Sequence, residues 1–371
     1  MDEKGVKEEK VASILEEARS KDVPYQRVLS SMCTRPHPLA IEAHRMFIET
    51  NLGDKVIFPG TAELEEKAVR MMGEMVNFSE VSGYITTGGT ESNVQALRAA
   101  RNMSDIQYPN VIVPESAHFS FDKIADVLRI EVRKAPLDDE FRADVGEVEN
   151  MVDEKTLAIV GIAGTTEHGQ IDSIPALGKI ALDNGIFFHV DAAFGGFVIP
   201  FLEKKYEFGF EIKGVDSITM DPHKMGLSTI PAGGLLFRDK SFIEALKVHT
   251  PYLTTKDQYS FVGTRSGAAV ASAFAVMKSL GREGYRKIVR RCIDLTRGLM
   301  DELGDIGVQP LIRPPMNVVT LDVAGERVKE RLYDKGWITS VTRGGALRLV
   351  IMPHVTEEVL DDFIHDLKSS I

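Results

Sequence analysis

The residue with the clearest capacity for chemistry is Lys224, which ends the sequence Asp221-Pro222-His223-Lys224. A lysine amine attacks an aldehyde when it is neutral, and burial beside a cationic group favours that form because it lowers the lysine pKa. The alternative is an exposed surface lysine, which is the common situation for this residue type. His223 has a parallel alternative as a loop histidine that only forms hydrogen bonds.

Asp191 and His118 are two further polar residues that follow apolar runs. Asp191 follows the run 186–190, and a carboxylate in that position must be hydrated, paired or catalytic. One suitable partner is a protonated pyridine nitrogen, and the alternative is a role as a helix N-cap. His118 follows the run 110–113. Its imidazole can stack on a flat ring and hydrogen-bond a carboxylate, or it can simply pack at the start of a helix.

A glycine-containing segment, Thr87-Gly88-Gly89-Thr90, follows the apolar run 83–86. Glycines let the backbone approach an anion, and the helix predicted next offers free N–H groups at its N-terminus. Thr90 can cap this helix or donate its hydroxyl to a phosphate. No Walker lysine and no G-x-G pattern accompany the segment, so it predicts neither a P-loop nor a dinucleotide site. A plain strand–helix turn is the alternative.

The elements that must position these residues alternate between about residues 60 and 240. Short apolar runs separated by helical patterns favour a mostly parallel sheet covered on both faces. The predicted strands are 83–86, 110–113, 157–163, 186–190, 217–220 and 234–237, and the predicted helices include 91–102, 122–128 and 174–184. Ligands of such sheets bind at the carboxyl ends of the strands, so we expect the polar segments to meet there. A phosphate loop, a stacking histidine, an aspartate and a lysine supply every part that pyridoxal phosphate (PLP) requires.

The same motifs give the chain a resemblance to a known family. The motifs are residues 87–93, 189–193 and 221–224. They resemble those of the group II PLP-dependent decarboxylases, which have the fold type I, aspartate aminotransferase-like, structure. Three stretches look most like the archaeal tyrosine/aspartate decarboxylases, namely residues 161–167, 192–196 and 216–226. The similarity begins at Asn51-Leu52-Gly53-Asp54 and ends at Met352-Pro353-His354, so it covers nearly the whole chain.

The resemblance implies how the cofactor would be held. Lys224 carries PLP as a Schiff base, Asp191 pairs with the ring nitrogen and His118 stacks on the ring. Ala193 packs on the opposite face of the ring. The residues implied on the phosphate side are Gly89, Thr90 and His223, and Thr166 is implied near the other ring substituents.

The resemblance also implies residues that handle the substrate or act across a subunit interface. Tyr252 matches a mobile-loop tyrosine that protonates the carbanion carbon, and Arg348 matches an arginine that holds the substrate carboxylate. Thr264 is expected to reach the phosphate bound by a partner subunit. Asp221 is expected to turn away from the phosphate, because two negative groups repel one another, or to accept backbone N–H groups.

The expected organisation is an N-terminal arm (1–50), a large PLP-binding domain (51–282) and a small C-terminal α+β domain (283–371). By the resemblance, the large domain should be an α/β fold with a mostly parallel, seven-stranded sheet. Residues 263–305 predict long helices, and the small domain should contain strands near 318–323, 337–341 and 347–352. A helix near 326–335 and a closing helix from Thr356 complete it.

Composition limits the classes of function. The net charge of -11 disfavours nucleic-acid binding, which needs a basic face. The two cysteines, Cys33 and Cys292, can build neither a disulfide framework nor a cysteine zinc site, and no metal is expected. No apolar run reaches the length of a membrane span, and the charged start lacks a signal-peptide region. The expectation is a cytoplasmic protein.

By the resemblance, the predicted function is PLP-dependent decarboxylation of an L-amino acid in a homodimer. The substrate is L-aspartate, giving the coenzyme A precursor β-alanine, or L-tyrosine, giving the methanofuran precursor tyramine, with aspartate favoured. An acidic substrate needs a second cation besides Arg348, and the candidates are Arg35, His37 and Arg343. The alternatives are another PLP enzyme (an aminotransferase, a desulfurase or a carbon–carbon lyase) and a non-catalytic scaffold.

Overall fold

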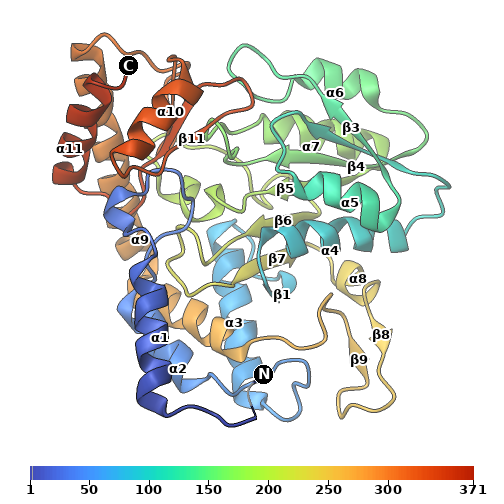
Figure 1. The fold of residues 1–371 in the computed structure, drawn as a ribbon. Helices are drawn as coiled ribbons and strands as arrows, with labels where there is room; N and C mark the ends of the chain where they lie inside the picture. The colour runs from blue at the N-terminus through green and yellow to red at the C-terminus, as the bar shows by residue number, and fades with distance from the viewer. Residues whose placement is uncertain (2) are drawn as a thin grey trace.

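The computed structural model of the chain describes Met1 and residues 3–371. A large sheet flanked by helices forms one part of the molecule, and a smaller sheet with its own helices forms the other (Figure 1). Within the described residues, no helix combines the length and the apolar character that crossing a membrane demands.

The large sheet has seven strands in the order β1-β7-β6-β5-β4-β2-β3. Their bounds are β1 Ser82–Thr86, β2 Asn110–Pro114, β3 Glu131–Ala135, β4 Thr156–Ile162, β5 Phe187–Asp191, β6 Ser217–Met220 and β7 Gly233–Phe237. Only β7 runs antiparallel, against both β1 and β6. The prediction of a mostly parallel, seven-stranded sheet is confirmed. The strand that the apolar runs did not indicate is β3, because it is an edge strand whose charged side chains remain partly exposed.

Helices cover the two faces of this sheet and form two separate cores. One core joins the sheet to α4 (Gly89–Asn102), α5 (Ser120–Leu128) and α8 (Lys240–Glu244). The other joins it to α3 (Pro59–Met75), α6 (Val145–Met151) and α7 (Ile174–Asn184). Four strands are buried along their whole length, namely β2, β4, β5 and β6. Burial of both faces explains why their sequences are largely apolar runs.

The C-terminal part is built on α9 (Gly267–Asp305) and a three-stranded antiparallel sheet. Its other elements are β10 Val318–Leu321, α10 Gly325–Asp334, β11 Ser340–Val341, β12 Leu347–Val350 and α11 Glu357–Lys368. Trp337 and Phe363 pack edge to face in its core. The backbone of Gly281 departs from helical geometry within α9, with φ 54°. We propose that this kink separates the large and small domains.

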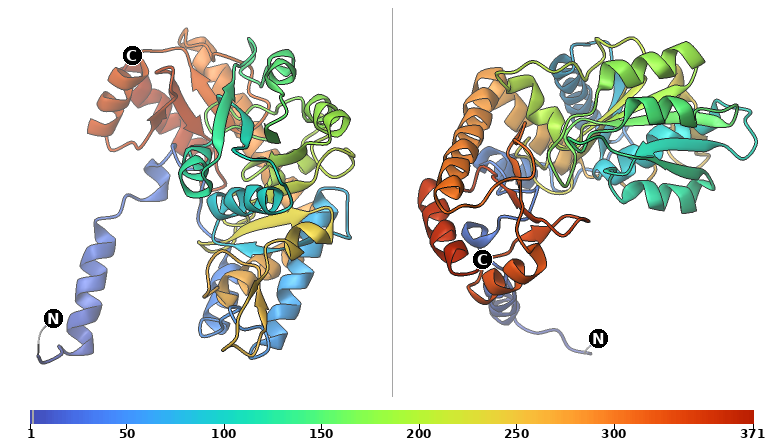
Figure 2. Two further views of the ribbon diagram at one scale, coloured as in Figure 1. Left: turned by 90° about the vertical axis from the view of Figure 1, so that its right-hand side faces the viewer. Right: turned by 90° about the horizontal axis from the view of Figure 1, so that it is seen from above.

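The N-terminal segment divides into parts with different contacts. Helix α1 (Glu8–Ser20) buries no residue and projects away from the rest of the chain (Figure 2). After η1 (Tyr25–Arg27), the Leu29 N–H donates to the Ile338 carbonyl (2.9 Å) and the Leu29 carbonyl accepts from Val350 N–H (2.7 Å). Helix α2 (Pro38–Met46) then packs against α9. Residues 28–30 therefore join the C-terminal part of the chain, although they are far from it in sequence.

Three short elements remain. The 3-10 helices η2 (Gly195–Phe197) and η3 (Ile199–Phe201) follow β5, and the hairpin of β8 (Val248–His249) and β9 (Asp257–Gln258) precedes α9. The hairpin extends beyond the large sheet (Figure 1). It contains Tyr252 at its tip.

Candidate active site

A cavity of about 290 Å³ lies at the carboxyl ends of the parallel strands. Eight of the residues predicted from sequence line this cavity: Gly89, Thr90, His118, Thr166, Asp191, Ala193, His223 and Lys224. The other lining residues are Met32, Thr87, Gly88, Glu91, Asn93, Ser116, Ile162, Gly164, Phe194 and Asp221. Strands β2, β4, β5 and β6 each end beside this cavity, which is the arrangement expected for a parallel sheet.

Lys224 and Asp221 form an ion pair inside the cavity. Nζ of Lys224 lies 3.2 Å from Oδ2 of Asp221. Burial by itself would lower the pKa of Lys224, but the negative charges of Asp221 and Asp191 outweigh it and raise that pKa. The expectation that a cationic neighbour depresses the lysine pKa is therefore wrong for this structure. The nearest charges are carboxylates.

The expectation for Asp221 is also wrong. Its side chain lines the cavity, is 1% exposed and faces Lys224 instead of turning away. Among the described residues, Oδ1 of Asp221 finds no hydrogen-bond partner. The physical reason is that Lys224, three residues later in the same turn, offers the carboxylate an ammonium group, which outweighs backbone N–H groups as a partner.

Asp191 is held by a buried hydrogen-bond network. Oδ2 accepts from Nδ2 of Asn93 (2.8 Å), and Oδ1 accepts from the backbone N–H of Ala193 (3.0 Å). The side-chain amide oxygen of Asn93, Oδ1, in turn lies 3.0 Å from Nε2 of His189 and accepts a hydrogen bond from the Thr219 hydroxyl (2.9 Å). Burial lowers the pKa of His189 to about 4, so this histidine is neutral at physiological pH. The network fixes the direction of the Asp191 carboxylate.

His118 lies in the loop between β2 and α5, where the Ser120 N–H donates to its Nδ1 (3.2 Å). This bond assigns the proton of the neutral ring to Nε2. Burial lowers the pKa of His118, which also favours the neutral ring. A neutral, planar imidazole on the cavity wall suits stacking against an aromatic ring.

The start of α4 forms a cradle for an anion. Gly88 has φ 142°, a conformation that favours glycine, and the first turn of α4 begins at Gly89. A Cβ at Gly89 would lie only 3.2 Å from Cβ of Ala193, so a side chain here would narrow the cavity. His223 completes this side, and its Nδ1 lies 2.6 Å from the Ala232 carbonyl.

These donors and charges fit PLP. The helix N-terminus and His223 suit a phosphate, Asp191 suits a pyridinium nitrogen, and Lys224 suits an aldehyde. Among the described residues, the buried Oδ1 of Asp221 has no hydrogen-bond partner, so the cavity contains a polar atom that a bound group could satisfy. The cavity therefore matches the chemistry of the cofactor from three sides.

Arg348 and Arg343 approach the cavity wall from the small domain. Arg348 is 6% exposed and donates from Nε to the Thr166 carbonyl (2.6 Å) and from Nη1 to the Ser30 carbonyl (2.9 Å). Burial lowers the pKa of Arg348 to about 10, so it remains charged near neutrality. Nη2 of Arg343 donates to the Ala117 carbonyl (2.9 Å), and its Nε lies 3.2 Å from Glu167. Neither arginine is among the lining residues themselves.

Besides Arg348, two further predicted residues lie outside the cavity of their own chain. Tyr252 is 85% exposed at the tip of the β8–β9 hairpin. Thr264 is exposed in the segment before α9. The structure does not bring either residue to Lys224 of the same chain.

No role was predicted for Asn93 or Met32, which also line the cavity. Asn93 could have been found from the sequence, because it lies on a predicted helix that must pack against the sheet. A buried side-chain amide needs hydrogen-bond partners, which marks it as a candidate site residue. Met32 had no such signal. It reaches the cavity because the N-terminal segment folds back on the small domain, and no local pattern encodes that contact.

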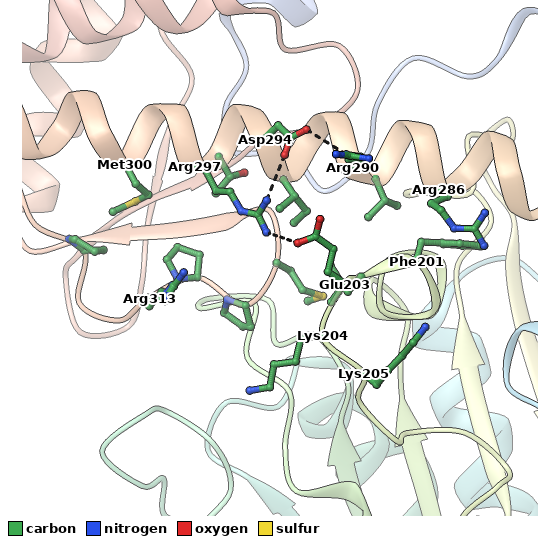
Figure 3. A pocket seen from close by; sticks show the side chains of 18 of the residues that line it. Phe201, Glu203, Lys204, Lys205, Arg286, Arg290, Asp294, Arg297, Met300 and Arg313 are labelled. Carbon is green, nitrogen blue, oxygen red and sulfur yellow. Dashed lines mark hydrogen bonds and ion pairs between the residues drawn. The ribbon is translucent and has the colours of Figure 1, made fainter.

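A second cleft, of about 700 Å³, lies between η3, α9 and residues 310–316 (Figure 3). Several of its charged side chains satisfy one another. Arg297 contacts Glu203 at 3.1 Å and Asp294 at 3.4 Å, and Arg290 lies 3.8 Å from Asp294. None of the residues predicted to perform chemistry lines it. The smaller cavity around Lys224 is therefore the candidate active site.

Comparison with known proteins agrees with this geometry. Residues 31–312 match the model of the pyridoxal-dependent decarboxylase conserved domain. A probable L-tyrosine/L-aspartate decarboxylase of Methanothrix thermoacetophila is 55% identical, over 99% of this chain and 96% of the relative. A probable L-aspartate decarboxylase of Archaeoglobus fulgidus is also 55% identical, over 96% of this chain and 98% of the relative.

Solved structures show the same fold. A Burkholderia pseudomallei sphingosine-1-phosphate lyase superposes with a TM-score of 0.91 at 25% identity, covering 100% of this chain and 91% of that one. A Lactobacillus brevis glutamate decarboxylase superposes with a TM-score of 0.90 at 23% identity, covering 100% and 93%. These neighbours confirm the expected fold type I architecture, and PLP is the cofactor that the matched domain uses. The chain belongs to the pyridoxal-dependent decarboxylase family.

Proposed function

We propose that this decarboxylase acts on L-aspartate to give β-alanine, with L-tyrosine, which gives tyramine, as the second candidate substrate. The observation that supports it is the convergence of Lys224, Asp191 and His118 on one cavity. The relatives that are 55% identical are named for aspartate, alone or together with tyrosine. The products would serve as precursors of coenzyme A and methanofuran respectively.

Each residue of the site has a role in this proposal. Bound PLP supplies an aromatic system that accepts the electrons of the bond being broken. Asp191 would hold the proton on the ring nitrogen, His118 and Ala193 would contact the ring, and Lys224 would hold the cofactor. Gly89, Thr90 and His223 would bind the phosphate, and Thr166 would lie near the remaining substituents. A pocket closed to water also disfavours the charged carboxylate of the substrate and so promotes loss of CO₂.

Two arginines support an acidic substrate. Arg348 would bind the carboxylate, and its charge persists near neutrality. Of the three candidates for a second cation, Arg343 lies beside the loop that contains Ser116 and His118. Arg35 donates to Gln26 (2.9 Å) and His37 caps α2, whereas Arg343, although paired with Glu167 at 3.2 Å, lies beside that loop. We therefore assign the side-chain carboxylate of aspartate to Arg343.

The proposal includes a cytoplasmic homodimer. Tyr252 and Thr264 would act at the cavity of the partner subunit, because neither reaches its own. Helix α1 supports this assembly, since Val11, Ile14 and Leu15 are 42%, 50% and 64% exposed. Cys33 and Cys292 are both free, as is usual in a reducing compartment. Tyr252 would return a proton to Cα after CO₂ leaves.

The test adds PLP to the purified protein, records the visible absorbance and then supplies L-aspartate or L-tyrosine separately. A cofactor band together with CO₂ and β-alanine or tyramine supports the proposal and identifies the substrate. A band without CO₂ would redirect the function to an aminotransferase or a carbon–carbon lyase. No band would contradict cofactor binding by Lys224 and favour a non-catalytic scaffold.

A further inference from the structure

The turn formed by residues 51–54 lies outside the cavity but hydrogen-bonds to the segment that contains Tyr252. The Asp54 side chain is 7% exposed and accepts hydrogen bonds from two consecutive threonines. Its Oδ2 accepts from the backbone N–H of Thr254 (3.0 Å) and from the Thr254 hydroxyl. Its Oδ1 accepts from the N–H (3.2 Å) and the hydroxyl (2.8 Å) of Thr255. One carboxylate thus binds two residues that are 200 and 201 positions away in sequence.

The turn of residues 51–54 also hydrogen-bonds to Arg265, at the other end of the segment that begins at Thr254. Oδ1 of Asn51 accepts from the N–H of Arg265 (3.0 Å), and the Leu52 N–H donates to the Arg265 carbonyl (2.9 Å). Nε2 of Gln258 donates to the Gly53 carbonyl (2.5 Å). The backbones pass so close that a Cβ at Gly53 would collide with the Gly263 carbonyl. Residues 254–265 are therefore attached to one turn at both ends.

The Tyr252 loop, residues 250–256, has few other contacts. Its hairpin contains only two paired positions, Val248 with Gln258 and His249 with Asp257. Within the loop, the Thr250 N–H donates to the Lys256 carbonyl (2.7 Å). Tyr252 itself is 85% exposed. With so little buried surface, the conformation of this loop depends mainly on its hydrogen bonds to Asp54.

We propose that Asp54 is a positioning residue, which fixes the Tyr252 loop in the conformation from which Tyr252 acts. This inference rests on the proposed function of Tyr252 as the proton donor. A carboxylate suits the task because each oxygen accepts one N–H and one O–H, and such charge-assisted bonds are stronger than neutral ones. The hydrogen bond from the Thr254 hydroxyl is the largest influence that lowers the pKa of Asp54, to about 2. The carboxylate therefore stays ionised in any ordinary assay.

The primary test measures amide hydrogen exchange of the PLP-loaded enzyme with Asp54→Asn. Amides of residues 250–256 should exchange about tenfold faster or more, because charge-assisted bonds are replaced by weaker ones. Amides of β4 and β5 should not change. Asp257→Asn is the matched control, since Asp257 is an exposed carboxylate of the same hairpin that lies 3.6 Å from exposed His249. Unchanged exchange in the Tyr252 loop of Asp54→Asn would overturn the inference.

A double variant, Thr254→Val with Thr255→Val, removes the two hydroxyls and leaves Asp54 intact. It should accelerate exchange in the same amides, which keeps the inference testable if Asp54→Asn folds poorly. Combining all three changes should add little to Asp54→Asn alone, because they remove one interaction. Full additivity would show that Asp54 acts on the loop by another route.

Turnover then separates positioning from a general structural role. In Asp54→Asn, kcat should fall while KM and the cofactor absorbance stay at wild-type values, and product partitioning should move toward that of Tyr252→Phe. Faster exchange with unchanged kcat and partitioning would refute a positioning role. If Tyr252→Phe itself behaves like wild type, the proposed function of Tyr252 fails, while the exchange data still report whether Asp54 holds the loop.

Discussion

Oδ2 of Asp221 lies 3.2 Å from Nζ of Lys224 in the cavity where four parallel strands end. The carboxylate is 1% exposed, and its second oxygen is an unpartnered buried atom among the described residues. The pair therefore stabilises the protonated lysine, whereas capture of an aldehyde needs the neutral amine. This relationship makes the protonation of Lys224 dependent on its neighbour.

Replacing Asp221 with Asn should shift the pH dependence of cofactor capture. Because the Asp221 charge raises the pKa of Lys224, its removal should lower the apparent pKa for capture. The measurement is the rate of growth of the cofactor absorbance when PLP is added to apo protein between pH 6 and 10, about the range where lysine titrates. An unchanged profile would show that Asp221 does not control the protonation of Lys224.

Lys224→Ala should abolish turnover because no other side chain in the cavity supplies an amine. Loss of about a thousandfold or more is expected, as for the removal of a covalent catalyst. The variant can still bind PLP through the phosphate cradle, which equilibrium dialysis would measure. Lys213→Ala, which removes a lysine outside the cavity, should retain wild-type turnover. Normal turnover in Lys224→Ala would remove this residue from the mechanism.

Asn93→Ala should weaken catalysis without preventing folding. Asp191 would lose the 2.8 Å hydrogen bond that directs its carboxylate, so kcat should fall by about tenfold. The buried His189 would lose its 3.0 Å partner as well. The control is Asn102→Ala at the exposed end of α4, where the amide donates to the Ala245 carbonyl (3.0 Å). If both variants have the same kcat, Asn93 does not act through Asp191.

Arg348→Lys should raise KM for the amino acid by about tenfold or more and leave the cofactor absorbance unchanged. A lysine has a single ammonium and cannot donate to the Thr166 and Ser30 carbonyls while also binding a carboxylate. Steady-state kinetics with the amino acid that the CO₂ assay identifies as substrate would measure KM and kcat separately. A change in kcat alone would argue against carboxylate binding by this residue.

Glu65→Gln should destabilise the fold by about 3 kcal/mol, since it leaves the buried Arg265 guanidinium without its carboxylate. Burial alone would raise the pKa of Glu65, but the charges of Arg265 and Lys55 outweigh it and lower that pKa to about 2. A depressed pKa means that the contribution is present above the unfolded value of 4.5 and is lost as pH falls toward 2.

Urea unfolding at neutral and acidic pH would measure this effect. The difference between wild type and Glu65→Gln should shrink as the pH falls below 4.5. Glu63→Gln is the control, because its 2.7 Å ion pair with Lys67 is exposed and should contribute nothing measurable. A difference that is independent of pH would contradict an ionised Glu65 in the folded state.

The sequence contained enough information to assemble most of the site. Lys224, Asp191 and the Gly88-Gly89 segment each follow an apolar run, and the carboxyl ends of parallel strands meet at one edge. The convergence of these residues is therefore a consequence of local periodicity together with a general rule of sheet topology. Strand β3 was not predicted, because an edge strand does not need apolar residues on both faces and its sequence therefore contains no apolar run.

Only the tertiary structure decided how the side chains face one another. Asp221 turns toward Lys224, Arg343 rather than Arg35 lies beside the cavity wall, and Asp54 holds Thr254 across 200 positions of sequence. Local patterns specify which face of an element is buried, but the direction of a polar side chain depends on which charges and donors the folded chain brings within hydrogen-bonding distance. That competition among partners is settled only when the whole chain has folded and brought them together.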